Sequence, residues 1–106
     1  MIRLIEYVTK DGKNHFAEWL DKIPATHATR VTEALYRMAL GNFGDHKSVG
    51  DGVMERRIFG SPALRIYYAQ DGKELVILLA GGSKNKQNKD ISKAKRLWEA
   101  YKSEKE

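Results

Sequence analysis

The segment 74–80, Glu-Leu-Val-Ile-Leu-Leu-Ala, constrains the fold of this chain more than any other stretch of the sequence. Turn signals bound its apolar run, with Asp71-Gly72 before it and Gly81-Gly82 after it. An apolar run of this length between turns is typical of a strand that is buried on both faces. The segment therefore predicts a strand placed centrally in a sheet, and the Asp-Gly pair predicts a hairpin to the strand before it.

Three other segments alternate apolar and polar residues, as half-buried strands do. The alternation is loose in 2–8 and clearer in 53–59 and 63–69. The tripeptide Gly60-Ser61-Pro62 turns the chain between the last two segments. Residues 41–52 are rich in Gly and Asp, and we predict that they form a loop.

Three further segments carry an apolar residue every three to four positions, which is the spacing of an amphipathic helix. Pro24 ends the first helix and opens the second, so these two form a helical hairpin, and the last helix runs from about 86 to 102. The apolar stripes are Phe16, Trp19, Leu20 and Ile23 in the first helix, Val31, Ala34, Leu35 and Met38 in the second, and Ile91, Ala94, Trp98 and Tyr101 in the last.

The predicted element order is β-α-α-β-β-β-α, which belongs to the α+β class with an antiparallel sheet, an N-terminal helical hairpin and a C-terminal helix. A chain of 106 residues has room for one domain, spanning 1–106. Neither a signal-peptide pattern nor an apolar run near the length of a membrane span is present in the sequence. We therefore predict a cytoplasmic protein with no membrane partner, and the lack of cysteine fits that compartment.

The formal net charge of +5 is unevenly distributed, because the whole excess falls in residues 54–106. It is densest in 84–96, where six lysines and arginines face only Asp90. This asymmetry indicates a polyanionic partner, which is nucleic acid, an anionic membrane surface or an acidic protein. The alternative is a solvated helix face kept basic for solubility. With no cysteine and no His pair at metal-ligand spacing, the sequence predicts neither a metal site nor a cofactor.

Strand alternation determines which way the charged residues of the sheet point. In 63–69, Arg65 and Tyr67 share one face, and the opposite, apolar face carries Leu64, Ile66 and Tyr68. If Met54 and Ile58 of the preceding strand pack on the core, the residues that join Arg65 are Glu55 and Arg57. Lys84 begins just past the last strand, near the same surface.

Arg56 is the exception in this pattern, because it falls on the face that we assign to the core. We expect its long side chain either to reach the sheet edge or to pair with an acidic residue.

The residues on the polar sheet face have the chemistry that metal-free RNA cleavage needs. Two guanidiniums can hold a phosphodiester and stabilise its transition state, and Tyr67 can stack on a base or bind phosphate. Glu55 can take a proton from a 2′-hydroxyl, and His46, beside Lys47, can contact phosphate or act as an acid or base. The alternative is that Glu55, Arg57 and Arg65 form only an exposed cross-strand cluster of ion pairs.

Nearly the whole chain resembles a known family, through motifs that occur in order along it. The motifs are Phe16-Ala-Glu-Trp-Leu20, Gly41-Asn-Phe-Gly-Asp45, Val49-Gly-Asp-Gly-Val-Met-Glu-Arg-Arg-Ile58, Leu64-Arg-Ile-Tyr-Tyr68, Leu78-Leu-Ala-Gly-Gly-Ser-Lys-Asn-Lys-Gln87 and Asp90-Ile91. In these motifs the chain resembles the RelE/ParE toxin superfamily and, more narrowly, its phage-related addiction-module killer proteins, which are akin to HigB-type toxins.

The resemblance implies a small antiparallel sheet with a helical hairpin on one side and a C-terminal helix. It also implies the toxin of a type II toxin–antitoxin module, neutralised by an antitoxin that usually carries a helix-turn-helix domain and is encoded nearby. RelE-like members are ribosome-dependent mRNA endonucleases that arrest translation and growth. By this resemblance the substrate is mRNA on the ribosome, cut by attack of the 2′-hydroxyl on the adjacent phosphate.

The resemblance also assigns roles to individual residues. The family's Gly-Tyr-Arg motif matches Ala63-Leu64-Arg65, and its Gly-Gly-x-Lys-x-x-Gln motif matches Gly81 to Gln87. The implied catalytic set is Arg65 and Arg57 for phosphate and transition-state charge, Lys84 as an electrostatic group or acid, and Glu55 as base. The predicted RNA-binding set is Tyr67, Lys86, Gln87, Lys89, Lys93, Arg96, His46 and Lys47.

Two positions depart from the family's pattern. Arg56 replaces a core leucine, and Ala63-Leu64 replaces Gly-Tyr. Two other functions remain open: a ParE-like poison of DNA gyrase that is not a nuclease, and an inactive relic that only binds its antitoxin. A plain RNA-binding module that uses the last helix is a third. A nuclease requires Arg57, Arg65 and Lys84 to converge on one phosphate, whereas a gyrase poison does not.

Overall fold

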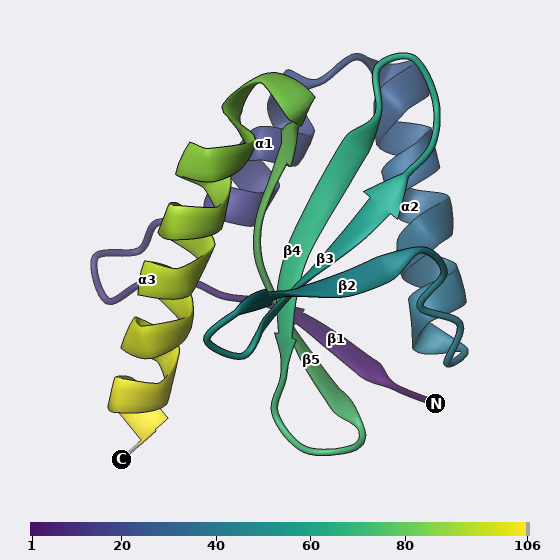
Figure 1. The fold of residues 1–106 in the computed structure, drawn as a ribbon. Coiled ribbons are helices and arrows are strands. Elements are labelled where there is room, and N and C mark those ends of the chain that lie inside the picture. Colours follow the sequence, from purple (N-terminus) through teal and green to yellow (C-terminus); the bar gives the residue numbers. More distant parts are fainter. Residues whose placement is uncertain (106) are drawn as a thin grey trace.

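The computed structural model describes residues 1–105, which fold around one five-stranded sheet (Figure 1). The strand order is β1-β5-β4-β3-β2, so the apolar strand β5 lies inside the sheet, as its sequence predicts. Neighbouring strands are antiparallel except β1 and β5, which run parallel. The strands are β1 (Arg3–Glu6), β2 (His46–Gly50), β3 (Val53–Ile58), β4 (Leu64–Gln70) and β5 (Leu75–Ser83).

Three α-helices cover the two faces of the sheet. Asn14 caps the first helix, because its side chain accepts a hydrogen bond of 2.9 Å from the backbone N–H of Ala17. A short 3₁₀ turn, η1 (Lys84–Lys86), leads from β5 into the last helix. The helices are α1 (His15–Lys22), α2 (Ala25–Ala39) and α3 (Gln87–Lys105).

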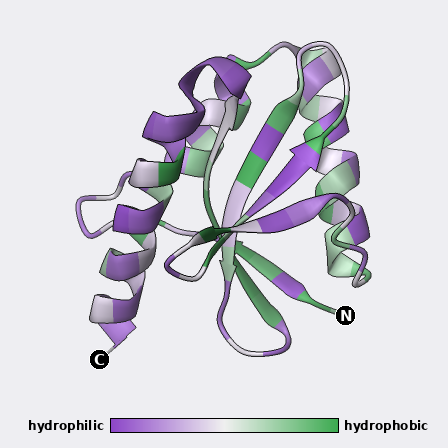
Figure 2. Ribbon diagram, in the orientation of Figure 1, coloured by the Kyte–Doolittle hydropathy of each residue, from purple (hydrophilic) through white to green (hydrophobic). Residues whose placement is uncertain are grey.

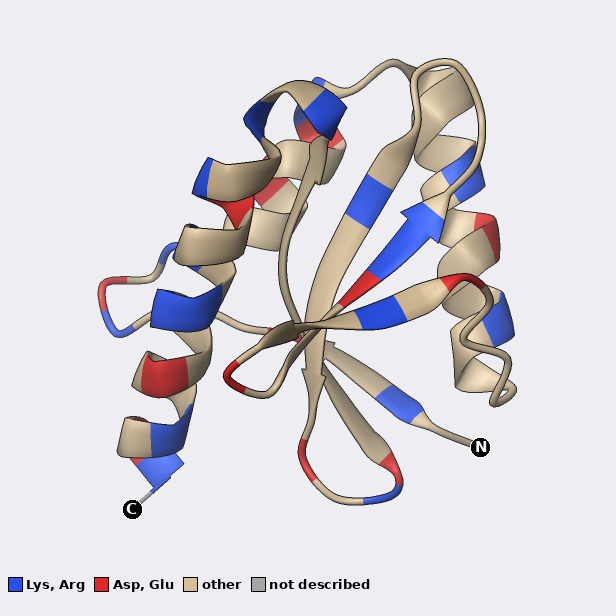
Figure 3. Cartoon of the chain, viewed as in Figure 1, with Lys and Arg blue, Asp and Glu red and all other residues tan. Residues whose placement is uncertain are grey.

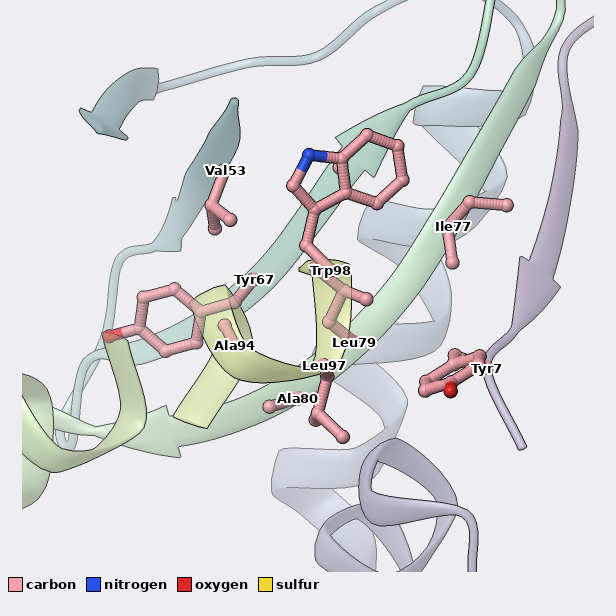
Figure 4. Packing of buried hydrophobic residues seen from close by; sticks show 10 residues of the cluster. Tyr7, Val53, Tyr67, Ile77, Leu79, Ala80, Ala94, Leu97 and Trp98 are labelled. Atoms are coloured by element: carbon pink, nitrogen blue, oxygen red, sulfur yellow. The ribbon is translucent and has the colours of Figure 1, made fainter. Parts of the chain in front are cut away.

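Each sheet face has its own apolar core, and both follow from the alternation of β4. Leu64, Ile66 and Tyr68 pack under the α1–α2 hairpin with Phe16 and Met38. The other face lies under α3, where Tyr67 of β4 packs with the strand and helix residues of a second core (Figure 4). The outer side of α3 is hydrophilic (Figure 2). The α+β class, the helical hairpin and the C-terminal helix are thereby confirmed.

Two details of the sheet differ from the sequence prediction. Part of the predicted loop 41–52 forms strand β2, which pairs antiparallel with β3 and adds a strand to the expected order. The reversal between them is made by Asp51 and Gly52, both at positive φ, and Asp tolerates this conformation better than most residues. The parallel β1–β5 pair replaces a fully antiparallel sheet, because residue alternation carries no information about strand direction.

The C-terminal half of α3 is attached to the sheet by aromatic and polar contacts. The hydroxyl of Tyr101 donates a hydrogen bond of 2.6 Å to Asp71, and the Tyr101 ring meets the Tyr7 ring edge-to-face with centroids 5.9 Å apart. The hydroxyl of Tyr7 donates to Glu104. These contacts hold α3 over the sheet face that carries Arg65. Among the helices within residues 1–105, none is long and apolar enough to cross a membrane.

Candidate functional site

A buried ion pair between Glu55 of β3 and Arg65 of β4 forms the centre of the candidate site. The strand register places Arg57 opposite Arg65 and Glu55 opposite Tyr67, so all four side chains share one sheet face, as predicted. Glu55 is 3% exposed and Arg65 is 5% exposed. The Arg65 Nε lies 3.5 Å from the Glu55 Oε1.

Two more elements bring side chains to Glu55. The Nε2 of Gln87, the first residue of α3, donates a hydrogen bond of 2.9 Å to the Glu55 Oε1. Lys47 of β2 pairs with Glu55 in the strand register, and its Nζ lies 3.9 Å from the Glu55 Oε2. Gln87 and Lys47 were predicted as RNA contacts. In the structure they hold Glu55 from opposite sides.

Arg65 has donors that no protein group satisfies. Its Nε and Nη1 are buried and lack a hydrogen-bond partner among residues 1–105, and so does the hydroxyl of Tyr67. A buried polar group without a partner costs about 1–3 kcal/mol, so such groups are rare in folded proteins. An anion that reached Arg65 would satisfy these donors and recover that cost.

Arg57 is held at the margin of the same face. Its Nε donates a hydrogen bond of 2.8 Å to the Asp45 Oδ2, and its guanidinium lies 5.0 Å from the centroid of the Phe59 ring. The Arg57 side chain is 45% exposed, so it remains accessible to a ligand. Asp45 and Phe59 were not predicted as its partners, because Asp45 was assigned to the loop 41–52 and Phe59 only to the end of the strand 53–59.

The lysines predicted for RNA contact lie on the surface beside this cluster. Lys84 is exposed in η1, directly after Ser83, whose neighbour Gly82 pairs with Arg65 across the β4–β5 ladder. Lys84 is therefore close to the cluster along the chain, and it lies at the rim of the cluster. A shallow hollow on the surface of η1 and α3 is lined by other predicted residues, namely Lys86, Lys89, Lys93 and Arg96. Figure 3 shows that basic residues are frequent along this part of the chain.

Tyr67, one of the predicted RNA contacts, is wrong in position, and a second, His46, lies apart from the cluster. Tyr67 is fully buried beneath α3, so its ring cannot stack on a base. His46 pairs with Arg56 in the strand register and therefore lies on the opposite sheet face from Glu55. There its ring contacts Phe43, with centroids 6.1 Å apart, and its Nδ1 lies 2.8 Å from the carbonyl oxygen of Gly44. The burial of Tyr67 was missed because residue alternation does not show which face a helix covers, and the facing of His46 was missed because β2 was not predicted as a strand.

The Gly81-Gly82 pair is explained by close packing at the end of β5. A Cβ on Gly81 would lie 2.1 Å from the Trp19 ring, and one on Gly82 would lie 1.9 Å from the Asp90 Oδ2. Glycine is therefore required at both positions, because α1 and the first turn of α3 approach the strand backbone directly. Burial of Asp90 raises the pKa of its carboxyl, against the opposing attraction of Lys93 and Lys86.

The raised pKa of Asp90 predicts a pH-dependent stability. A carboxyl with a folded-state pKa above its unfolded value stabilises the fold most below the unfolded pKa, and this contribution is lost as pH rises through the folded pKa. An Asp90→Asn variant stays neutral at every pH. We expect its melting temperature to rise relative to the parent as the pH is raised from below to above about 4, the ordinary pKa of an aspartate. Thermal melts across this range test the prediction, and a pH-independent difference would contradict it.

The candidate site is built from arginine, lysine and carboxylate groups. Within residues 1–105, no group of three or more His, Asp or Glu side chains lies close enough together to hold a metal ion.

Comparison with known proteins shows which family this fold resembles. A five-stranded sheet with a helical hairpin on one face and a C-terminal helix on the other is broadly consistent with the RelE-like fold. Residues 18–99 match the family described as Phage derived protein Gp49-like (DUF891). The chain therefore belongs to this family, a RelE-like family of toxins from toxin–antitoxin modules.

A similar protein occurs in Haemophilus influenzae, where it is described as an uncharacterized protein. It is 43% identical to this chain over 83 residues, which make up 77% of this chain and 84% of the relative. The match thus spans most of both chains.

Proposed function

We propose that this protein is a HigB-like toxin that cleaves mRNA on the ribosome and thereby arrests translation and growth. The observation that supports this most is the buried Arg65, which has two donors without partners beside the Glu55 carboxylate. A guanidinium held in this way is prepared to bind the nonbridging oxygens of a phosphodiester. Arg57, directly opposite in the strand register, supplies a second positive charge.

The proposed reaction needs no metal. Glu55 takes the proton of a ribose 2′-hydroxyl, and the freed oxygen attacks the adjacent phosphorus. Arg65 and Arg57 stabilise the additional negative charge of the transition state. The bond from phosphorus to the 5′-oxygen then breaks, and Lys84 supplies the proton that this oxygen needs. The products are a 2′,3′-cyclic phosphate and a 5′-hydroxyl end.

Access to Glu55 and Arg65 requires a local rearrangement, because both side chains are almost completely covered. Gln87 is the first residue of α3 and hydrogen bonds to Glu55, so the first turn of this helix must move before RNA can enter. The far end of α3 is attached independently through Tyr101 and Tyr7. The helix can therefore open at its N-terminal end without leaving the sheet.

The basic residues of η1 and α3 fit a sequence-independent contact with RNA phosphates (Figure 3). Lys86, Lys89, Lys93 and Arg96 would hold ribosomal RNA or mRNA while the buried cluster acts on one phosphate. The second partner in this proposal is an antitoxin of the helix-turn-helix type, encoded nearby, which neutralises the toxin by covering or distorting the basic face.

Inducing the protein in bacteria and mapping RNA ends tests this function. We expect growth arrest together with new 5′-hydroxyl ends inside translated regions of mRNA, and none in a reporter mRNA that lacks a ribosome-binding site. An Arg3→Gln variant, changed at an exposed residue of β1 on the far edge of the sheet, is the matched control and should cut normally. Arrest with intact mRNA and double-strand DNA breaks would instead identify a gyrase poison. Normal growth with retained antitoxin binding would identify an inactive relic.

A further inference from the structure

A hollow of about 280 Å³ between α2 and the end of β3 is lined by four arginines, and the functions above do not use it. Only two carboxylates, Glu33 and Asp45, line it as well. We refer to this hollow as the arginine pocket. Its arginines are Arg30 and Arg37 of α2 and Arg56 and Arg57 of β3.

Arg56 forms the buried wall of the arginine pocket. It is 7% exposed, and its Nε is buried without a hydrogen-bond partner among residues 1–105. Its Nη1 reaches the carbonyl oxygen of Asn42 only at 3.4 Å. A Cβ on Gly44 would lie 2.5 Å from the Arg56 Cζ, so the glycine backbone encloses the guanidinium. Sequence reasoning expected Arg56 to pair with an acid or reach the sheet edge. Instead it is fixed in place with a donor unused.

The positive charge of the pocket is not neutralised by its own carboxylates. Among residues 1–105, neither Arg37 nor Arg56 forms an ion pair with a carboxylate. Asp45 is already bound to Arg57. Burial lowers the pKa of Arg56, and repulsion by Arg37 lowers it further. Arginine nevertheless remains positively charged at neutral pH. A buried positive charge without a carboxylate partner is stabilised when an anion binds to it.

An exposed aromatic ring lies beside the pocket. Phe59 is 69% exposed, and the guanidinium of Arg57 lies 5.0 Å from its ring centroid. The Arg30 Nη2 donates hydrogen bonds of 2.7 Å and 3.0 Å to the carbonyl oxygens of Phe59 and Pro62, which fixes the turn that carries the ring. A large apolar ring held in this way in solvent is suited to stacking on a nucleobase.

We propose that the arginine pocket binds a phosphate group of single-stranded RNA while a neighbouring base stacks on Phe59. Pockets for whole drug-sized ligands measure roughly 300–1,000 Å³, so this hollow suits a phosphate, with the base outside it. Arg57 lines the pocket and also faces Arg65 in the strand register. The RNA would therefore continue from the Glu55–Arg65 cluster around the end of β3. This proposal rests on the proposed function only in taking RNA as the ligand.

The test measures binding of a fluorescent eight-nucleotide oligouridylate to the free protein by anisotropy at several salt concentrations. We expect Arg37→Gln and Arg56→Leu each to weaken binding about fivefold or more. Each should also reduce by about one the salt slope, which is the slope of log affinity against log salt concentration. Phe59→Ala should weaken binding without changing the slope, because stacking releases no counterion. Arg3→Gln, which removes an equal charge on β1, is the control and should bind like the parent. Since Arg37 is exposed, its variant carries the test even if Arg56→Leu fails to fold.

Competition distinguishes the sources of the phosphate. Oligouridylate should compete far more strongly than uridine monophosphate, and inorganic phosphate should compete least. Binding of inorganic phosphate without oligouridylate would overturn the RNA assignment, and so would unchanged RNA affinity in both arginine variants. Loss of antitoxin binding with normal RNA binding would show that the pocket recognises an acidic protein segment, which also overturns the proposal. If the protein shows the expected charge-dependent RNA binding but does not cleave mRNA, the nuclease function is refuted and the proposal for the arginine pocket stands.

Discussion

An Arg65→Ala variant is expected to cleave mRNA on programmed ribosomes about 10²- to 10³-fold more slowly than the parent chain, which is the usual effect of losing one donor to a transition-state oxyanion. The reason is the position of Arg65, whose Nε and Nη1 are buried without a hydrogen-bond partner while its guanidinium lies beside the carboxylate that is proposed to remove the proton. Single-turnover cleavage rates measure the effect on chemistry, apart from ribosome binding. Growth after induction should recover in parallel.

The control for this prediction keeps the charge of Arg65 and changes only its shape. An Arg65→Lys variant retains the ion pair with Glu55 but loses the planar fork of donors, so we expect a rate between those of the parent and Arg65→Ala. Circular dichroism and antitoxin binding establish that each variant is folded. If folded Arg65→Ala cleaves within about tenfold of the parent, Arg65 does not stabilise the transition state.

The facing of the central strands could be read from the sequence, because side chains on a strand alternate with a period of two. Placing Leu64, Ile66 and Tyr68 on one face was enough to place Arg65 on the other, and the register with β3 confirms that Glu55 and Arg57 join it. The same reasoning correctly placed Arg56 on the hairpin face. Its environment there depends on the 42–44 loop and on α2, and strand periodicity contains no information about either.

Strand β2 could not be predicted from its composition. It is a short edge strand whose first residues are exposed and polar, so no apolar alternation marks it. It forms because the Asp51-Gly52 turn brings its backbone alongside β3. The consequence for the site is large, since the register puts Lys47 next to Glu55 and turns His46 to the other face. A one-residue change in register would have exchanged these two roles.

The burial of Tyr67 was predictable from two observations that sequence reasoning kept separate. The last helix carries the stripe Ala94, Leu97 and Trp98, which must pack on an apolar surface, and Tyr67 and Ala69 provide one on the second face of β4. The polar sheet face is therefore covered at its centre, whereas Arg57 and Lys47 at its margin remain exposed. This arrangement explains why the charged pair is buried, and it leads to the next prediction.

A Glu55→Met variant is expected to lower the free energy of unfolding by about 3–5 kcal/mol, because it leaves the Arg65 guanidinium buried without its carboxylate. Lys47 also loses its partner, but its side chain is exposed and contributes little. Chemical denaturation at neutral pH measures the change. Methionine nearly preserves the length of the glutamate side chain, so the loss reports the missing charge rather than a cavity.

The double variant Glu55→Met/Arg65→Met separates stability from function. Replacing both members of a buried ion pair by apolar residues of similar size is commonly neutral or stabilising, so we expect the double variant to recover most of the lost stability. It should nevertheless be inactive in cleavage, since it lacks both the proposed base and the proposed phosphate ligand. Such a result would mean that this sheet folds readily without its buried charges and keeps them for their action on RNA. If Glu55→Met costs the same with or without Arg65, the two residues are not coupled, and the buried pair would need another explanation.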